Sequence, residues 1–579
     1  MNQIPLRYSA LLASVFFIII GISTSFFIQT DFGNVHTKEV DFLTEEGVLI
    51  HSTLQVPKIA TSTNPRPGVV IIHGVYQSKE WLRAFGIELT RRGFVALTID
   101  AASHGNSGYA SYNSDRGGVA ALEYLHNLPY VSKLGLVGHS MGAGIAIQAL
   151  NITTLPIDSL VFVGGGSRNM EEWANTTYPK NLLITVGRYD ELFDIQDLYS
   201  SLGSIFGISS VNPNQLYGDF DDGTARKLII GETNHLFETI DPIIISETID
   251  WLNDSLFDTT NEKWKSKSNL IYPFWIIGGG ISCIGIILSI IPLMAILIDL
   301  PFFYNLKNNP DSKYEVTTRN YWIYGLVYAI ITSGSFLPAI LFPSVLPFPQ
   351  NLGDSVGIWL VVSALLGILV FILIKRFQIE KNNPQISWGD FGIDEDYKTF
   401  SLVLGRSTLL ALLIFLWLYC WTLLVDIFLA LDFSVFLPLF NDLPYNPPRL
   451  QMMPIYLIFT VPFFLIEGMW LMGILRTNSK ETWRKTRLFQ TGKAVVIKCG
   501  IYALILLVQL MMGLLLGKPF IYGFLGFYLL FFWILTPFFI ITTLITSWSY
   551  FLTKRVYIGA MLNSIIFSWT LASILTLAM

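Results

Sequence analysis

Gly135-Leu-Val-Gly-His-Ser-Met-Gly-Ala-Gly144 is the stretch that decides the fold of this chain. Its centre, from Gly138 to Gly142, has the pattern G-x-S-x-G and lies between an apolar run and a helical one. Ser140 is expected on a sharp turn between a strand and a helix, where Cβ atoms at the flanking positions would collide. Such a turn exposes the hydroxyl and begins a helix whose free N–H groups favour negative charge. The motif predicts a nucleophilic serine, but small residues recur by chance in apolar chains, so its context must support it.

The composition divides the 579 residues into two parts. Residues 30–265 carry 16 basic and 28 acidic side chains, and the remainder carries 21 basic and 14 acidic ones. All seven histidines lie in the first part and all three cysteines in the second, so the first part forms no disulfide. The mean hydropathy of +0.53 is too high for a wholly soluble protein. We expect an acidic domain that carries the acid–base chemistry, joined to a membrane part, and no nucleic-acid binding.

Nine apolar runs are long enough to cross a bilayer. The first, residues 9–28, is expected to be an uncleaved anchor, with a cleaved signal peptide as the alternative. The other eight are residues 271–300, 321–344, 356–374, 407–430, 453–475, 495–516, 519–548 and 556–578. The expected order is therefore a cytoplasmic N-terminus (1–8), the anchor (9–28), a folded domain (37–256), a linker (257–270) and a polytopic membrane domain (271–579).

The distribution of positive charge predicts the orientation of these spans. With the N-terminus inside, the short inner loops hold 17 Lys and Arg residues, and the short outer loops hold two, Arg449 and Lys518. This asymmetry follows the positive-inside rule at every crossing. It places the folded domain and the C-terminus outside, in a multi-pass protein of the cell membrane. Asn151, Asn175 and Asn253 begin Asn-x-Ser/Thr triplets that would permit glycosylation there.

The folded domain alternates strand-like and helical segments. Strands are expected at residues 40–44, 48–57, 68–73, 94–100, 134–139, 160–164, 182–187 and 227–231, and helices near 79–92, 115–128, 140–150 and 240–252. The middle strands are nearly continuous in Val, Ile and Leu, as in strands buried on both faces. The pattern predicts an α/β domain with a mostly parallel sheet and helices on both faces.

An acid and a base follow the last two expected strands of the folded domain, both after Ser140. Asp190 comes directly after the run 182–187, and His235, the last histidine of the chain, follows the run 227–231. In an open parallel sheet, the carboxyl ends of the strands gather at one edge. A serine nucleophile needs such a base, and the base needs an acid that fixes its tautomer.

Residues 37–256 resemble the α/β-hydrolase superfamily in four separated pieces. These are Val-Val-Ile-Ile-His73-Gly74, the turn from Asp100 to Gly108, the elbow at Ser140, and Asp190 and His235 in that order. The resemblance implies a catalytic triad of Ser140, Asp190 and His235. It also implies an oxyanion hole made by the backbone N–H groups of Val75 and Met141, and it names no cofactor. The helical remainder resembles no family.

Other residues of the folded domain are expected to surround the site or to offer alternatives to its members. His73, Gly74, Gly138, His139 and Gly142 are expected to be structural neighbours of the site, as is His104. Asp194 is an alternative to Asp190 as the acid. Residues 191–226 are expected to form a small lid or flap. The spacing of His and carboxylate residues shows no strong metal-binding pattern, so no metal site is expected.

The apolar part contains three charged residues at bilayer depth, where charges are expensive. Asp426 is expected near the outer leaflet, and Glu467 and Lys498 toward the inner one, where they could pair. They are functional candidates, although interhelical clips without a function are the simpler interpretation. The outer loops 342–351 and 437–449 are rich in proline and aromatic residues and are expected to be docking surfaces for the folded domain.

These patterns favour a membrane-embedded serine hydrolase that cleaves an acyl ester, with a lipid ester as a candidate, through an acyl-enzyme. A serine aminopeptidase-like peptidase and a membrane acyltransferase are alternatives, since one fold supports many activities. A third alternative is a transporter or sensor with a non-catalytic binding domain. The expected partners are an ester, lipid or peptide substrate and the lipid bilayer, and the sequence identifies no protein partner.

Overall fold

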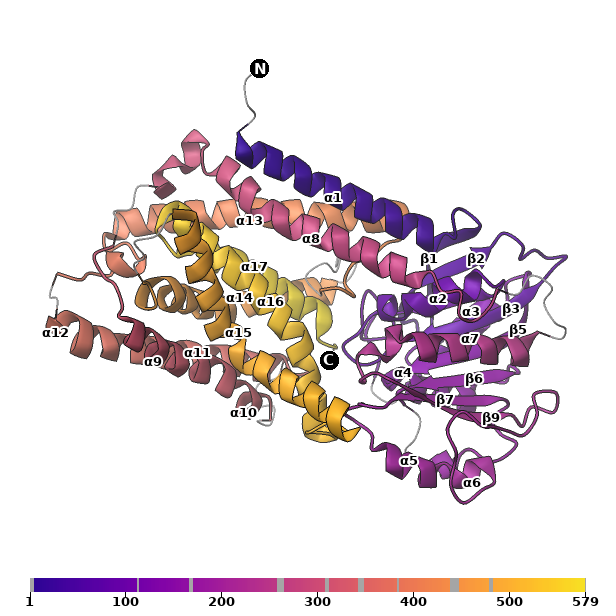
Figure 1. Ribbon diagram of the computed structural model, residues 1–579. Helices are drawn as coiled ribbons and strands as arrows, with labels where there is room; N and C mark the ends of the chain where they lie inside the picture. The colour runs from indigo at the N-terminus through magenta and orange to yellow at the C-terminus, as the bar shows by residue number, and fades with distance from the viewer. Residues whose placement is uncertain are drawn as a thin grey trace.

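The chain forms two parts that lie end to end (Figure 1). The computed structural model describes residues 5–111, 114–165, 170–257, 265–307, 312–341, 348–382, 385–437, 447–477 and 483–577. Residues 35–257 form a sheet covered by helices, here called the sheet domain, and the remaining helices form the helical domain. The N-terminus lies away from the sheet domain, whereas the C-terminus lies next to it (Figure 1).

The sheet has nine strands in the order β1-β2-β4-β3-β5-β6-β7-β9-β8. They are β1 (Val35–Leu43), β2 (Leu49–Pro57), β3 (Arg66–Ile72), β4 (Val95–Ile99), β5 (Val131–His139), β6 (Ser159–Val163), β7 (Leu182–Gly187), β8 (Leu216–Tyr217) and β9 (Arg226–Gly231). The central pairs from β4 to β9 are parallel, while β1, β2 and β8 pair antiparallel. The mostly parallel sheet expected from the apolar runs is confirmed.

Helices cover both faces of the sheet because its central strands are apolar on both sides. In β3, Val69 and Ile71 face one layer and Val70 and Ile72 the other. The first layer contains α2 (Arg83–Thr90) and α7 (Pro242–Leu256), and the second contains α3 (Gly118–His126), α4 (Met141–Ile152) and α5 (Ile195–Ser201). Continuous Val, Ile and Leu runs thus give strands without a solvated face.

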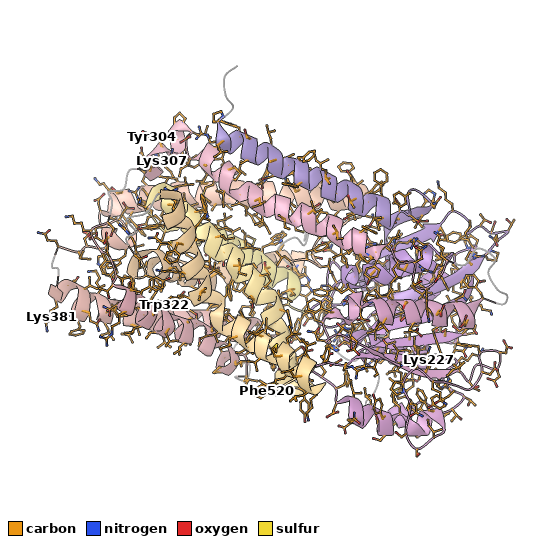
Figure 2. The ribbon with its side chains drawn as sticks, in the orientation of Figure 1. Lys227, Tyr304, Lys307, Trp322, Lys381 and Phe520 are labelled. Atoms are coloured by element: carbon orange, nitrogen blue, oxygen red, sulfur yellow. The ribbon has the colours of Figure 1, made fainter. Side chains whose placement is uncertain are left out.

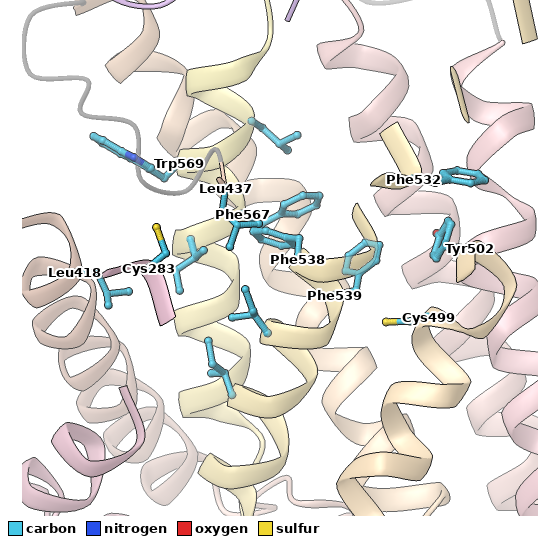
Figure 3. Packing of buried hydrophobic residues seen from close by; sticks show 14 of the residues in the cluster. Cys283, Leu418, Leu437, Cys499, Tyr502, Phe532, Phe538, Phe539, Phe567 and Trp569 are labelled. Carbon is cyan, nitrogen blue, oxygen red and sulfur yellow. The ribbon is translucent and has the colours of Figure 1, made fainter. Parts of the chain in front are cut away.

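Nine helices of the described residues are long and apolar enough to cross a membrane, judged by length and composition. They are Leu6–Gln29, Tyr272–Leu297, Thr318–Ile340, Gly353–Ile379, Tyr397–Leu429, Pro448–Ile474, Arg487–Leu516, Phe524–Thr553 and Tyr557–Ile574. The last of these, α17, is the most enclosed, with 94% of its apolar window buried. Figure 3 shows Phe567 of α17 against Phe538 of α16 (Phe524–Thr553), with ring centroids 5.0 Å apart. These spans match the nine apolar runs of the sequence.

The first helix, α1 (Leu6–Gln29), packs along α8 (Tyr272–Leu297) through small residues. A Cβ added to Gly21 would lie 2.4 Å from the carbonyl oxygen of Gly278, and one added to Gly285 would lie 2.9 Å from the backbone of Ile18. Such close approach of two backbones is a common way to pack helices within a bilayer. That residues 9–28 are an uncleaved anchor stays a prediction.

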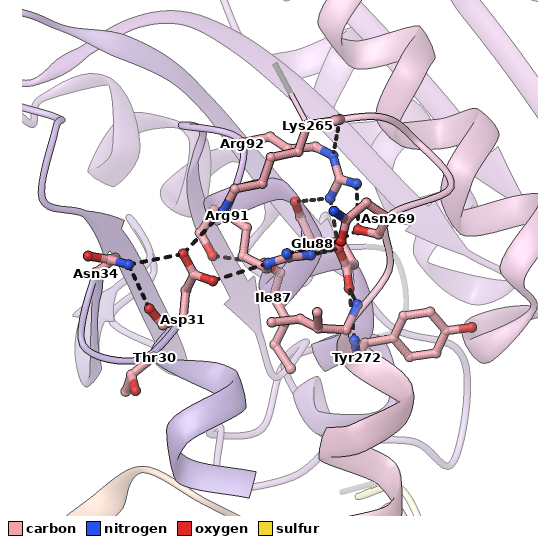
Figure 4. A network of polar contacts seen from close by, with 12 residues as sticks. Thr30, Asp31, Asn34, Ile87, Glu88, Arg91, Arg92, Lys265, Asn269 and Tyr272 are labelled. Atoms are coloured by element: carbon pink, nitrogen blue, oxygen red, sulfur yellow. Dashed lines mark hydrogen bonds and ion pairs between the residues drawn. The ribbon is translucent and has the colours of Figure 1, made fainter. Parts of the chain in front are cut away.

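A polar network ties the sheet domain to the start of α8 (Figure 4). Glu88 of α2 accepts hydrogen bonds from the backbone N–H groups of Ile271 (2.6 Å) and Tyr272 (2.8 Å). These are orphan donors at a helix N-terminus, where a carboxylate also opposes the positive end of the helix dipole. Arg91 and Arg92 hold Glu88 and bind the carbonyl oxygen of Asn269. The network fixes the direction in which α8 leaves the sheet domain.

Basic loops of the helical domain gather at the end that points away from the sheet domain. Lys307 and Lys381 lie at that end (Figure 2). Arg555 pairs with Asp394 and donates to the carbonyl of Leu306, which brings three of these loops together. At the opposite end, Arg449 donates to the carbonyl oxygen of Ser103 in the sheet domain (2.7 Å). The basic residues assigned to inner loops thus lie at the end of the helical domain away from the sheet domain, and Arg449, assigned to an outer loop, lies at the end next to it.

Two expectations about loops are modified by the structure. Residues 342–347 and 438–446, most of the two expected docking loops, lie outside the described residues; in the described part, Arg449 donates to the carbonyl oxygen of Ser103 in the sheet domain. Residues 191–226 form α5, α6 (Gly203–Phe206) and β8, and their apolar side chains, such as Leu198 and Ile205, pack into the core. The expected lid is wrong for these helices, because they cover the sheet rather than the serine.

Candidate active site

Ser140 occupies the sharp turn between β5 and α4. Its backbone has φ 53° and ψ −113°, a strained conformation that costs on the order of 1–3 kcal/mol and that tight packing must hold in place. A Cβ added to Gly138 would lie 2.4 Å from the carbonyl carbon of Gly142, and one added to Gly142 would lie 2.2 Å from the carbonyl oxygen of Ile72. Both glycines are therefore required by contact, as the motif predicts.

The structure brings Ser140, His235 and Asp190 into one chain of hydrogen bonds. Nε2 of His235 lies 2.9 Å from Oγ of Ser140, and Nδ1 of His235 lies 2.8 Å from Oδ2 of Asp190. Asp190 is fully buried and also accepts the backbone N–H of Leu192 (2.6 Å). Asp194 instead caps α5 by accepting the N–H of Gln196, so it is not the partner of His235.

The surroundings of His235 favour its protonated form. Burial alone would lower the pKa of this imidazole, but the charge and hydrogen bond of Asp190, aided by Glu191, more than offset it and raise the pKa above 6.5. Glu191 accepts the backbone N–H of His235 (3.1 Å). Burial and the neighbouring Asp190 raise the pKa of Glu191 to about 7. Asp190 thus makes His235 a stronger base, and Asp190 is itself held in place by the backbone N–H of Leu192.

Glu238 and His139 form a second buried layer behind the imidazole. Glu238 accepts the N–H of Gly187 (2.5 Å), and its Oε2 lies 3.5 Å from Nδ1 of His235 and 3.4 Å from Nε2 of His139. Burial and then Asp190 raise the pKa of Glu238 well above its ordinary value, while burial keeps that of His139 low. His139, His235 and Glu238 place three possible metal donors within 4.8 Å of one another. Because both ring nitrogens of His235 already contact Asp190 and Ser140, we interpret the group as support for the triad.

Two backbone N–H groups border the serine where an oxyanion would form. Met141 is the first residue of α4, where an N–H has no intrahelical partner. Val75 lines the cavity beside Ser140, and the preceding Gly74 is so close that an added Cβ would lie 3.2 Å from Cβ of Ser140. Gln77 fixes this loop by accepting the N–H of Gly74 (2.8 Å). Val75 and Met141 thus flank Ser140, and their role as an oxyanion hole stays a prediction.

His73 and His104 lie beside the site but do not reach Ser140. His73 accepts the backbone N–H of Ala101 (3.1 Å), and its other nitrogen lies 2.7 Å from the carbonyl oxygen of Gly74. His104 contacts the carbonyl oxygen of Ala102 (3.2 Å), and the two rings meet edge to face. Burial lowers the pKa of both side chains. Their positions agree with a structural role in the loops after β3 and β4.

The helical domain roofs the cavity beside Ser140. This cavity has a volume of about 50 Å³, and its lining includes Phe527, Leu530 and Phe531 of α16. Tyr76 of the sheet domain packs against Phe531, with ring centroids 5.5 Å apart. Gly523 donates its N–H to the carbonyl oxygen of Glu191 (2.6 Å), which anchors the start of α16 next to the acid of the site. The site therefore faces a helix of the helical domain.

The three charged residues of the apolar part divide into two groups. Glu467 and Lys498, both fully buried, form an ion pair, and Tyr328 donates to Glu467 (3.3 Å). Asp426 is buried near the end of α13 (Tyr397–Leu429) that faces the sheet domain, where its charge helps to raise the pKa of Lys79 and Arg83. The possible pairing of Glu467 with Lys498 is present, and Asp426 lies close enough to the sheet domain for its charge to act on Lys79 and Arg83.

The sheet domain is similar in sequence to a known protein family. Residues 69–242 match the sequence model of the alpha/beta hydrolase family. Similar solved structures include a predicted CIB-like hydrolase from Thermoplasma acidophilum, with 16% identity over 38% of this chain and 98% of that one and a TM-score of 0.30. An esterase from Pyrococcus furiosus has 22% identity over 39% and 92% of the two chains and a TM-score of 0.29. No curated protein matches the sequence. The sheet domain is an α/β hydrolase domain, and it is fused to a helical domain rich in apolar spans.

Sequence reasoning missed two features of the site: the buried acids Glu191 and Glu238 near His235, and the cover that α16 forms over the cavity. Glu191 follows Asp190 directly, and Glu238 lies three residues after His235, so acids next to expected triad members were a usable signal. No comparable signal exists for Phe527 and Phe531, since aromatic residues in an apolar helix are common. Their role depends on how α16 docks against a domain some 300 residues earlier in the chain.

Proposed function

We propose that this chain is a multi-pass membrane serine hydrolase that cleaves an acyl ester through an acyl-enzyme on Ser140. The observation that carries the proposal is the hydrogen-bond chain from Ser140 Oγ through His235 to Asp190, at 2.9 and 2.8 Å. A nucleophile, a base and an orienting acid in this order and geometry are the parts that acyl transfer requires.

In the first half of the reaction, Oγ of Ser140 attacks the carbonyl carbon of the ester while Nε2 of His235 accepts the hydroxyl proton. The carbonyl oxygen becomes an oxyanion, which the N–H groups of Met141 and Val75 stabilise. Asp190 keeps Nδ1 of His235 protonated, so that Nε2 is the nitrogen free to act as base. The imidazolium then protonates the leaving alcohol, the C–O bond breaks, and the acyl group remains on Ser140.

In the second half, water takes the place of the alcohol. Nε2 of His235 accepts a proton from water as the water oxygen attacks the acyl carbon. The second tetrahedral intermediate collapses, Ser140 regains its proton from His235, and the carboxylic acid leaves. Glu191 and Glu238 take no proton in these steps and hold the backbone and ring of His235 in place.

The hydrolase domain faces away from the cytoplasm in this proposal. The support is the accumulation of basic loops, including Arg555 and Lys307, at the end of the helical domain opposite the sheet domain. In intact cells that express the chain, a membrane-impermeant fluorophosphonate should label Ser140 as fully as it does in lysed cells. Labelling that requires lysis would reverse the orientation.

The catalytic part is tested with a small fluorophosphonate and the purified full-length protein. Covalent labelling should map to Ser140 and disappear in Ser140→Ala, with ester hydrolysis lower by about 10⁶-fold. Ala149→Ser, a substitution of similar size in the buried face of the same helix, is a matched control that should keep labelling. A folded wild type without labelling would instead favour a binding domain of a transporter or sensor.

A further inference from the structure

A second cavity adjoins the one beside Ser140, at the contact between the two domains. The first cavity measures about 50 Å³ and the second about 220 Å³. Trp81, Leu236 and Ile534 line both, so the two spaces share a wall. The second space exceeds the ~150 Å³ of an apolar protein cavity that takes up benzene. It lies within reach of a group attached to the ester carbonyl at Ser140.

Five segments that are far apart in sequence build the second cavity. They contribute Ala84 from α2, Phe237 from residues 236–240, Trp275 and Ile276 from α8, Phe436 from the segment after α13, and Trp533 and Pro537 from α16. Trp275 packs against Phe436, with ring centroids 5.8 Å apart, and Phe237 packs against Trp533 at 5.3 Å. The cavity exists because the sheet domain and the helical domain meet there, and its wall is mainly aromatic and aliphatic.

The polar groups of the wall are mostly engaged. The carboxylate of Glu80 binds Nε of Arg83 (2.8 Å) and Nζ of Lys79 (3.3 Å), and Thr239 donates to the carbonyl oxygen of Leu236 (3.3 Å). Among the described residues, the buried indole N–H of Trp275 has no acceptor. A peptide would bring a donor and an acceptor with each residue, and burying them unpaired is costly. A hydrocarbon chain with at most one oxygen near Trp275 has no such cost.

The far side of the cavity reaches the surface of the apolar helices. Pro537 of α16 is exposed and Ile276 of α8 is partly exposed, and both belong to helices long and apolar enough to span a membrane. Exposed apolar neighbours continue along these helices, with Ile277 at 53% and Ile540 at 37%. Hydrocarbon can therefore pass between the surroundings of the helices and the cavity without crossing a polar layer.

We propose that the second cavity binds the hydrocarbon chain of a long-chain acyl ester whose carbonyl is presented to Ser140. The inference rests on the proposed function of Ser140 and narrows it to lipid-type substrates that enter from the bilayer side. Ala84, Ile276 and Trp533 then determine the accepted chain, and the helical domain acts as part of the substrate site. Apolar contacts with the cavity wall supply the affinity, and among the described buried polar side-chain groups of the wall only the indole N–H of Trp275 lacks a partner.

The test compares an ethyl and a dodecyl fluorophosphonate on the full-length protein. In each reaction, Oγ of Ser140 forms a bond to phosphorus, fluoride leaves, and the serine proton passes to His235. We expect the dodecyl probe to react at least ~10-fold faster, in the range of 10–200-fold that apolar pocket contacts provide. Ala84→Phe and Ile276→Trp, which line the cavity from the sheet domain and the helical domain, should each lower the dodecyl-to-ethyl rate ratio about 10-fold.

Leu514→Phe is the matched control. Leu514 lines a neighbouring cavity of about 310 Å³ at the same contact between the domains, so this substitution should leave the rate ratio unchanged. Labelling of each variant by the ethyl probe reports that it is folded. If the wild type reacts with both probes equally, or a peptide phosphonate reacts faster than the dodecyl probe, the chain site is wrong while Ser140 remains the nucleophile. If neither probe labels Ser140, the proposed function itself fails and this inference fails with it.

Discussion

Each domain buries a carboxylate against a nitrogen base, and the two pairs differ in what lies beside them. In the sheet domain, Asp190 and His235 stand next to the hydroxyl of Ser140 and a cavity. In the helical domain, Glu467 and Lys498 are enclosed by aromatic rings, with Nζ of Lys498 4.4 Å from the centroid of Phe463 and 4.3 Å from that of Phe539. Burial and charge are alike in both places. A nucleophile and room for a substrate distinguish a candidate catalytic site from a clip between helices.

The largest expected effect on turnover distinguishes Asp190 from Asp194, the alternative acid. Asp190→Asn should lower turnover by about 10⁴-fold, because the amide no longer fixes the tautomer of His235. Asp194→Asn is the matched control, since Asp194 caps α5 and should be nearly silent in the same ester assay. Comparable loss in both variants would mean that the assay reports folding rather than the acid of the triad.

The second prediction tests whether the membrane pair is structural. Glu467→Gln and Lys498→Met should each lower the free energy of unfolding by roughly 3–5 kcal/mol, because one buried charge loses its partner. The double variant should recover most of this loss. Thermal or denaturant unfolding in detergent measures the effect.

Ethyl-fluorophosphonate labelling supplies the other readout for these variants. Per folded molecule, labelling of Ser140 should not depend on either substitution. Should Glu467→Gln fold as well as the wild type but lose hydrolysis, the contrast between the two pairs would be mistaken.

The smallest expected effect is a displaced pH profile. His235 must be neutral to accept a proton, and Asp190 raises its pKa above 6.5, so kcat/KM should fall as pH drops through a value higher than 6.5. In Asp190→Asn, burial still lowers the pKa of His235, but the charge of Asp190 no longer raises it. The residual activity should therefore persist to lower pH. Glu191→Gln separates the titration of Glu191, whose pKa is about 7, from that of His235. An acid limb that does not move in Asp190→Asn would contradict the assigned pair.

Much of the sheet domain could be predicted because local patterns determine it. The apolar runs at residues 68–73 and 134–139 become β3 and β5. Gly138 is required by its local contact with Gly142, whereas Gly142 is required by the backbone of Ile72 in the neighbouring strand β3. One rule predicts that Ser140, Asp190 and His235 lie close together: the carboxyl ends of parallel strands share an edge of the sheet. The nine apolar spans were equally visible, because each is a long local run.

The remainder depends on contacts between distant segments. The expected lid at 191–226 was wrong for α5 and α6, whose Leu198 and Ile205 fit the core, and α16 covers the serine instead. Glu238 reaches His235 because η3 (Phe237–Ile240) turns back toward β7, where it accepts the N–H of Gly187. No period or spacing in a single sequence encodes which transmembrane helix docks on which loop.

The most direct test of the central claim is to identify the acyl-enzyme. The full-length protein is mixed with a long-chain p-nitrophenyl ester, quenched in acid during turnover, digested and analysed by mass spectrometry. We predict that the peptide containing Ser140 gains the mass of the acyl group less one proton, and that Ser140→Ala shows neither the modified peptide nor p-nitrophenol release. Steady release of p-nitrophenol by the wild type, with the acyl group on another residue or on none, would contradict the account.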